Sequence, residues 1–205
     1  DVMELFRQLL KGLKIKTTQK DLPPFIGGAC GFFSYDYGLS FEELEPKTED
    51  DLSTPDLYFS FVDKVICFDH EKKELHLMAL GDNKKDSEKL LEKVEVDAEK
   101  GSYICKDSLG GASESGELVS NLTFDEYKGK IATIKKYLKN GETYQVNFAQ
   151  RFQLESDEDP WEVYKKLTSL NPSPHGGFFD AEDFVVASCS PEELVSVRNG
   201  KVRTC

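Results

Sequence analysis

Two short segments in the second half of the chain carry polar side chains whose types and spacing could do chemistry. In Tyr144-Gln145-Val146-Asn147 polar and apolar residues alternate, so on a strand Gln145 and Asn147 would project to the same face. Two carboxamides on one face either point to water or form a polar pocket floor that orients the oxygens of a ligand. The alternation by itself favours the solvated face.

The second segment ends in a carboxyl group, Glu192 of Ser190-Pro191-Glu192, which follows a run of small and apolar residues. A glutamate at the end of a strand is usually solvated. A carboxyl held against apolar walls would instead have a raised pKa and could serve as a general acid. Asn171-Pro172-Ser173-Pro174 is open to two interpretations in the same way, because two prolines usually fix a turn for structural reasons.

Composition and charge exclude several classes of protein. The 205 residues include 26 Lys and Arg against 38 Asp and Glu, a formal net charge of −12, which argues against binding to a polyphosphate backbone. No apolar run approaches the roughly 18 residues of a membrane span, and the N-terminal residues lack the layout of a signal peptide. We expect a globular cytoplasmic protein that binds neither nucleic acid nor membrane.

The cysteines and histidines show neither a disulfide framework nor metal-ligand spacing. The cysteines are odd in number, scattered and without a Cys-x-x-Cys pair, which indicates reduced thiols. The histidines are not spaced as metal ligands either, so we expect no metal site within this chain. These residues are Cys30, Cys67, Cys105, Cys189 and Cys205, with His70, His76 and His175.

The elements that must position the polar segments alternate between helices and antiparallel hairpins, which predicts an α+β fold. For the first half we expect an amphipathic helix that ends near 12–14 and a buried strand within 25–36, where three glycines suggest close approach of another group. A loop over 41–56, a hairpin of 57–69 with 74–80, and a charged surface helix over 82–100 follow.

The second half begins after a Gly- and Ser-rich stretch, 102–117, which predicts a linker between an N-terminal subdomain at 1–101 and a second domain at 118–205. Thr123 and Glu126 have the spacing of a helix capping box, and Asn140-Gly141 predicts the end of that helix. Further along we expect a strand over 142–152, a helix from 160, a turn over 171–177, a strand over 184–188 and an Asn-Gly hairpin over 194–204.

Taken together, these motifs resemble the chorismate-utilising enzymes in order and spacing. The motifs are Glu142–Asn147 with Gln150–Phe152, Asn171–Pro174, Ser188–Glu192, and an upstream signature at Gly27–Asp36 that two members share, the component I subunits of anthranilate synthase and aminodeoxychorismate synthase. Val146-Asn147 is more similar to the second of these. The resemblance implies part of the family's two-layer antiparallel sandwich, with an incomplete catalytic domain at 118–205 and a longer synthase around it.

Roles for individual residues follow from the same resemblance. Glu192 corresponds to the family's general acid for departure of the C4 hydroxyl of chorismate, and Gln145, Asn147 and Ser190 to positions of the substrate pocket. The resemblance also implies Mg²⁺ on the substrate carboxylates, with its ligands expected beyond residue 205. Tryptophan-binding positions of the family match Pro174, His175 and Gly176, although His175 stands where the family usually has Tyr or Phe.

The implied function is amination of chorismate to 4-amino-4-deoxychorismate, with ammonia from a glutamine amidotransferase subunit, for para-aminobenzoate and folate synthesis. One alternative is anthranilate synthase component I. The resemblance implies that aminodeoxychorismate synthases carry a nucleophilic Lys where anthranilate synthases have Ala. We expect this distinguishing position just after Cys205. A further alternative is a non-catalytic module that binds L-tryptophan. We expect these 205 residues alone to bind no magnesium and to turn over no chorismate.

Overall fold

The structure, a computed structural model, describes residues 2–12, 15–17, 20–45, 50–101 and 116–204. The chain forms two compact units, Asp1–Asp107 and Ser108–Cys205, and each is described by itself. The predicted linker at 102–117 lies almost entirely outside the described residues. Both units combine helices with antiparallel strand pairs, which confirms the α+β prediction.

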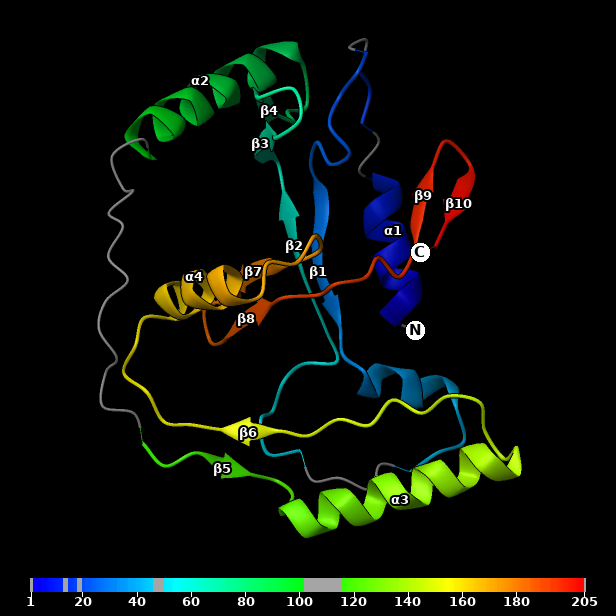
Figure 1. The fold of residues 1–205 in the computed structure, drawn as a ribbon. Coiled ribbons are helices and arrows are strands. Elements are labelled where there is room, and N and C mark those ends of the chain that lie inside the picture. Colours follow the sequence, from blue (N-terminus) through cyan, green and yellow to red (C-terminus); the bar gives the residue numbers. More distant parts are fainter. Residues whose placement is uncertain (1, 13–14, 18–19, 46–49, 102–115, 205) are drawn as a thin grey trace. The chain divides into compact units, whose positions relative to one another are not determined.

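The described residues of the first unit form two helices, a short 3₁₀ helix and two antiparallel strand pairs, β1–β2 and β3–β4 (Figure 1). Helix α2 packs on β3 and β4, where Val94 and Met78 are buried. The two predicted helices are confirmed, and the predicted hairpin is confirmed only in the part from Lys64 on, which forms β3–β4. The elements are α1 Val2–Gly12, β1 Gly28–Phe33, η1 Asp36–Phe41, β2 Leu57–Val62, β3 Lys64–Asp69, β4 Glu74–Ala79 and α2 Lys84–Gly101.

Aromatic rings attach α1 to the β1–β2 pair. The ring of Phe6 lies 4.6 Å from that of Phe59 and 6.1 Å from that of Phe33, centroid to centroid. A Cβ on Gly31 would lie 1.9 Å from the carbonyl oxygen of Tyr58, so the expected close approach to the glycine strand is made by the backbone of β2. The strand is nevertheless not buried as predicted, because half of its residues, including Phe33, are exposed.

The run 57–69 is divided at Asp63 into two strands of separate pairs. The carbonyl oxygen of Asp63 accepts a hydrogen bond of 2.7 Å from the backbone N–H of Leu80, which closes the β3–β4 hairpin. The residues before Asp63 pair instead with β1, Val62 lying opposite Gly28. The sequence prediction treated this run as one arm of a hairpin, and the structure corrects it.

In the second unit, residues 116–204 form two helices and three antiparallel pairs, β5–β6, β7–β8 and β9–β10 (Figure 1). Helix α4 packs on the β7–β8 pair, and the ring centroid of Phe178 lies 5.0 Å from Trp161 and 5.5 Å from Tyr164. The predicted helix at 160 and the Asn-Gly hairpin are confirmed. The elements are β5 Val119–Ser120, α3 Phe124–Asn140, β6 Phe152–Gln153, α4 Pro160–Leu170, β7 Gly177–Asp180, β8 Val185–Ser188, β9 Ser196–Arg198 and β10 Lys201–Arg203.

Helix α3 begins and ends where its capping signals predict. The Thr123 hydroxyl accepts a hydrogen bond of 3.3 Å from the Glu126 N–H, and the Glu126 carboxylate accepts one of 2.8 Å from the Thr123 N–H. Gly141 ends the helix in the left-handed region at φ 73°, which glycine adopts without strain. The hydrogen bonds from Thr123 lower the pKa of Glu126.

The strand predicted over 142–152 is wrong. Only Phe152–Gln153 forms a strand, β6, and residues 142–151 belong to none. The side chain of Tyr144 is 93% exposed, so the alternation of this segment does not separate a buried face from a solvated one. The argument that Gln145 and Asn147 share a strand face therefore fails.

Large apolar side chains are exposed in both units. Among the described residues, the buried hydrophobic ones are Met78, Val94 and Ala181, whereas Leu170 and Leu194 are 84% and 88% exposed. Every described strand pairs with a single neighbour, so one edge of each strand has no partner strand in the described part of the chain. None of the described helices has the length and apolar character needed to cross a lipid bilayer.

Candidate functional site

The segment that carries Glu192 leaves the end of β8 and runs without regular structure to the start of β9. The Ser190 hydroxyl donates a hydrogen bond of 3.2 Å to the carbonyl oxygen of Glu192, and Pro191 between them has a fixed φ. The Glu192 side chain is exposed, so in the described structure no apolar wall surrounds its carboxyl. Water and a ligand can both reach it.

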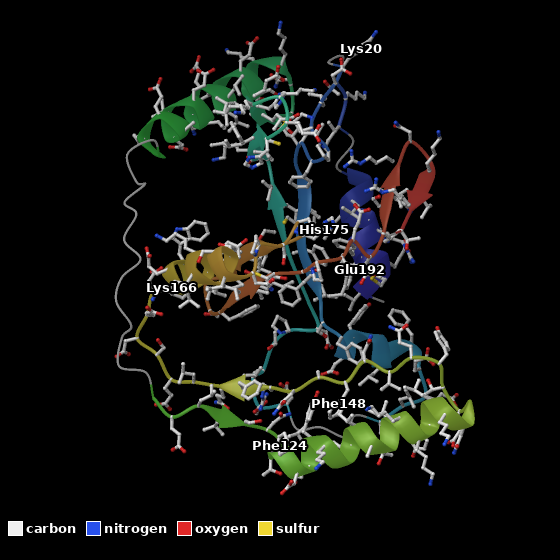
Figure 2. The ribbon with its side chains drawn as sticks, in the orientation of Figure 1. Lys20, Phe124, Phe148, Lys166, His175 and Glu192 are labelled. Atoms are coloured by element: carbon white, nitrogen blue, oxygen red, sulfur yellow. The ribbon has the colours of Figure 1, made fainter. Side chains whose placement is uncertain are left out.

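The predicted tryptophan turn lies beside this segment. The backbone N–H of His175 donates a hydrogen bond of 3.2 Å to the carbonyl oxygen of Ser190, and the N–H of Gly176 donates one of 3.3 Å to Ser173 within the turn. Figure 2 labels His175 and Glu192 on these two neighbouring segments. Pro174, His175 and Gly176 are all exposed. The structure thus brings the turn, Ser190 and Glu192 into one region of the second unit.

Glu193, which sequence reasoning missed, has the most strongly anchored carboxylate of this region. Its Oε2 accepts hydrogen bonds from the Ser196 hydroxyl at 3.0 Å and from Arg203 Nε and Nη2 at 3.3 and 3.2 Å. The hydrogen bond from Ser196, followed by the hydrogen bond and charge of Arg203, lowers the pKa of Glu193, and the charge of His175 adds to this.

A signal for this cluster was present in the sequence. The Asn199-Gly200 turn fixes the register of the β9–β10 hairpin, and this register places Ser196 directly opposite Arg203. The paired residues carry a hydroxyl and a guanidinium, both of which donate hydrogen bonds, and two consecutive glutamates precede them by a few residues. This pattern predicts that the two donors bind the carboxylate of a glutamate. Extending the predicted hairpin to its register would have found it.

The predicted substrate-pocket residues are brought together only in part. Ser190 contacts Glu192, but among the described residues no hydrogen bond joins Gln145 or Asn147 to either of them. The segment of these two amides is instead attached to α3, because the ring of Phe148 lies 5.4 Å from that of Tyr127. Figure 2 shows Phe148 over this helix.

An open cavity of ≈ 630 Å³ follows the same face of α3. It is lined by Glu126, Gly129, Lys130, Thr133, Ile134 and Phe148, so it includes none of the predicted site residues. Among the described residues, no three His, Cys, Asp or Glu side chains gather into a site that could hold a metal ion, and the thiols of Cys30, Cys67 and Cys189 are free. Cys105 and Cys205 lie outside the described residues.

Curated relatives match almost the whole chain. Aminodeoxychorismate synthase component 1 of Bacillus subtilis is 31% identical, with 98% of this chain and 43% of the relative covered. Anthranilate synthase component 1 of Acetivibrio thermocellus is 29% identical, with 97% and 43% covered. The chain thus spans less than half the length of these relatives.

A solved structure and a family description agree with these relatives. The crystal structure of anthranilate synthase component I from Streptococcus pneumoniae superposes with a TM-score of 0.76 at 28% identity, covering 98% of this chain and 46% of that one. The family described as chorismate binding enzyme matches residues 3–205. The resemblance of the motifs is therefore confirmed, and the chain belongs to the chorismate-binding enzyme family.

Proposed function

We propose that the enzyme containing this chain aminates chorismate to 4-amino-4-deoxychorismate. Family membership over residues 3–205 supports chorismate as the substrate. Relatives named aminodeoxychorismate synthase component 1, at 29–31% identity, support the reaction and a second component. We further propose that this second component is a glutamine amidotransferase subunit that supplies ammonia. The net reaction converts chorismate and ammonia into aminodeoxychorismate and water.

The observation that carries the proposal is the family match over residues 3–205. We assign the acid to Glu192, whose carboxyl is exposed in the middle of the irregular segment 189–195, which hydrogen bonds hold to the neighbouring turn. Loss of the C4 hydroxyl of chorismate requires an acid, because hydroxide leaves poorly unless it is protonated. As a nucleophile forms a bond to C2, the ring double bonds shift, the C4–O bond breaks, and the oxygen takes the proton of Glu192 and leaves as water. Ammonia then forms a bond to C4, the double bonds shift back, and the bond between C2 and the nucleophile breaks, which releases the nucleophile. The proton that the new ammonium group loses returns to Glu192.

The test compares two glutamine substitutions in the full-length enzyme. Glu192→Gln removes the proton donor and is expected to lower kcat for chorismate by at least about a hundredfold, the scale of general acid catalysis. The matched control is Glu162→Gln on α4, a half-exposed glutamate that pairs with Lys165 at 2.7 Å and lies outside the candidate site. Unchanged turnover in Glu192→Gln would show that this carboxyl is not the acid.

The second candidate is anthranilate synthase component I. The relative from Acetivibrio thermocellus and the Streptococcus pneumoniae structure favour it, whereas Val146-Asn147 favours amination at C4. Both reactions start from chorismate and ammonia and need the same acid, so only the product distinguishes them. Chromatography of the reaction mixture for 4-amino-4-deoxychorismate and for anthranilate decides between the two.

We also propose that the exposed turn Pro174-His175-Gly176 binds L-tryptophan in the full-length protein. Its accessibility and its hydrogen bond to the Glu192 segment support this. Calorimetry with L-tryptophan tests it, and the absence of heat would contradict it. Heat without any chorismate turnover would favour the non-catalytic module.

Among the described residues, no three His, Cys, Asp or Glu side chains gather into a ligand set for Mg²⁺. We propose that Mg²⁺ binds the substrate carboxylates of chorismate through ligands that lie outside the described residues.

A further inference from the structure

We infer that Glu193 is a positioning residue that holds the backbone of Glu192 in place for proton transfer. This inference rests on the proposed function, in which Glu192 is the general acid. Glu193 itself does not take part in the chemistry, because its carboxylate points to the β9–β10 hairpin and is occupied there.

The backbone around Glu192 needs such an anchor because it lacks regular structure. Residues 189–195 belong to no helix or strand, so no ladder of backbone hydrogen bonds fixes them. On the N-terminal side, the hydrogen bonds between Ser190 and Glu192 and between His175 and Ser190 restrain the segment. On the C-terminal side, the carboxylate of Glu193 provides the restraint, one peptide bond after the proposed acid.

The two partners of Glu193 give this anchor a rigid base. Ser196 and Arg203 face each other across the β9–β10 pair, and both bind the same carboxylate oxygen. The Glu193 side chain is 21% exposed, whereas that of Arg203 is 71% exposed. Two consecutive glutamates are therefore used differently: Glu193 is held against the hairpin, and Glu192 extends into solvent.

The placement of the acid affects the rate of the chemical step, and it affects the binding of substrate much less. A displacement of a catalytic group by about 1 Å can reduce the rate on the order of a hundredfold. Loss of the Glu193 anchor would let the Glu192 segment sample other positions without removing any group that contacts chorismate. The expected signature is a fall in kcat with little change in KM.

The test uses the full-length enzyme with Glu193→Gln, Arg203→Gln and the double variant. Each single variant is expected to lower kcat about tenfold with KM for chorismate within about twofold, and the double variant to be no worse than either, since both remove the same interaction. The charge exchange Glu193→Arg with Arg203→Glu is expected to recover part of the loss. Glu162→Gln is again the matched control.

A second measurement does not depend on turnover. Hydrogen–deuterium exchange of the peptide that contains 189–195 is expected to accelerate in Glu193→Gln and in Arg203→Gln, but not in the control. Should Glu193→Gln fail to fold, Arg203→Gln provides the same test, because it leaves Glu193 and Ser196 in place.

The outcomes separate this inference from the proposed function. Additive losses in the double variant, unchanged kcat in both single variants, or unchanged exchange would overturn the role of Glu193. If Glu192→Gln retains full turnover, the proposed acid is wrong and the positioning role is overturned with it. If Glu192→Gln is inactive while Glu193→Gln is normal, only the positioning role is overturned.

Discussion

The backbone N–H of His175 donates a hydrogen bond of 3.2 Å to the carbonyl oxygen of Ser190. This bond joins the turn before β7 to the segment after β8, whose strands are themselves paired. A change in the backbone of the turn is therefore transmitted to the segment that carries Glu192.

Gly176→Ala is expected to destabilise the second unit. The new Cβ would lie 3.0 Å from the carbonyl oxygen of Ser188 and 3.5 Å from that of Ser173, so the turn must move away from β8. We expect a loss of about 1 kcal/mol, the lower end of the cost of overpacking. Gly177→Ala is the control, because its Cβ would meet nothing within 4 Å. Equal urea midpoints for the two variants would contradict the prediction.

Gly31→Ala is expected to disrupt the first unit more severely. Its Cβ would lie 1.9 Å from the carbonyl oxygen of Tyr58 and 2.8 Å from the Cα of Phe59. Backbone atoms of a paired strand cannot move aside without breaking the pair, so we expect a loss of about 3 kcal/mol or more. Gly38→Ala, whose Cβ has open space around it, should change the unfolding free energy little. Thermal unfolding followed by circular dichroism measures both.

Thr123→Ala is expected to weaken helix α3. The substitution removes the hydroxyl that accepts the Glu126 N–H, and the loss of such an N-cap costs about 1 kcal/mol. Thr133→Ala is the control, since Thr133 only bonds back to the Gly129 carbonyl within the same helix, at 3.1 Å, and alanine favours helix. If urea denaturation finds Thr133→Ala the more destabilised, the capping box is not important for stability.

The capping box also makes stability depend on pH. Hydrogen bonds from Thr123 lower the pKa of Glu126 from its ordinary value of 4.5, so the folded state favours the carboxylate more than the unfolded state does. The stabilisation is complete above 4.5 and is lost as the pH falls through the lowered folded pKa. Glu126→Gln should therefore unfold more readily than the unaltered protein near neutral pH, and the difference should shrink in acid. A difference independent of pH would contradict this.

Helix α3 could be predicted from the sequence because its signals are local. The capping hydrogen bonds of Thr123, Glu126 and Gly141 all lie within the first and last turns of the helix. The same is true of the β9–β10 hairpin, where Asn199 and Gly200 both have positive φ. In both elements, the residues from which the element is predicted are also the residues that fix its ends or its turn in the structure.

The strand at 142–152 was predicted wrongly because alternating polar and apolar residues show which face of a strand would be buried, but not whether another strand pairs with it. A strand forms only where another strand pairs with it, and no described strand pairs with residues 142–151. The division of 57–69 at Asp63 has the same origin. Nothing within that run indicates that β2 pairs with a strand as distant in sequence as β1.

The residues of the candidate site that a motif names were predicted, whereas the Glu193 cluster required the hairpin register to be worked out as a further step. Glu192 and the turn at 174–176 came from motif order, and the structure places their segments together. Glu193 has no motif of its own. Its role depends on Ser196 and Arg203, which become neighbours only once the hairpin register is known.

The pairing pattern implies an order of events during synthesis of the chain. The pairs β3–β4, β7–β8 and β9–β10 join successive strands across short connections, and such hairpins form within about 1–10 μs. Strands β5 and β6 are separated by the whole of α3, so closing that larger loop carries a greater entropic cost. As the polypeptide leaves the ribosome, β5 must therefore wait for the complete helix to emerge before its partner arrives.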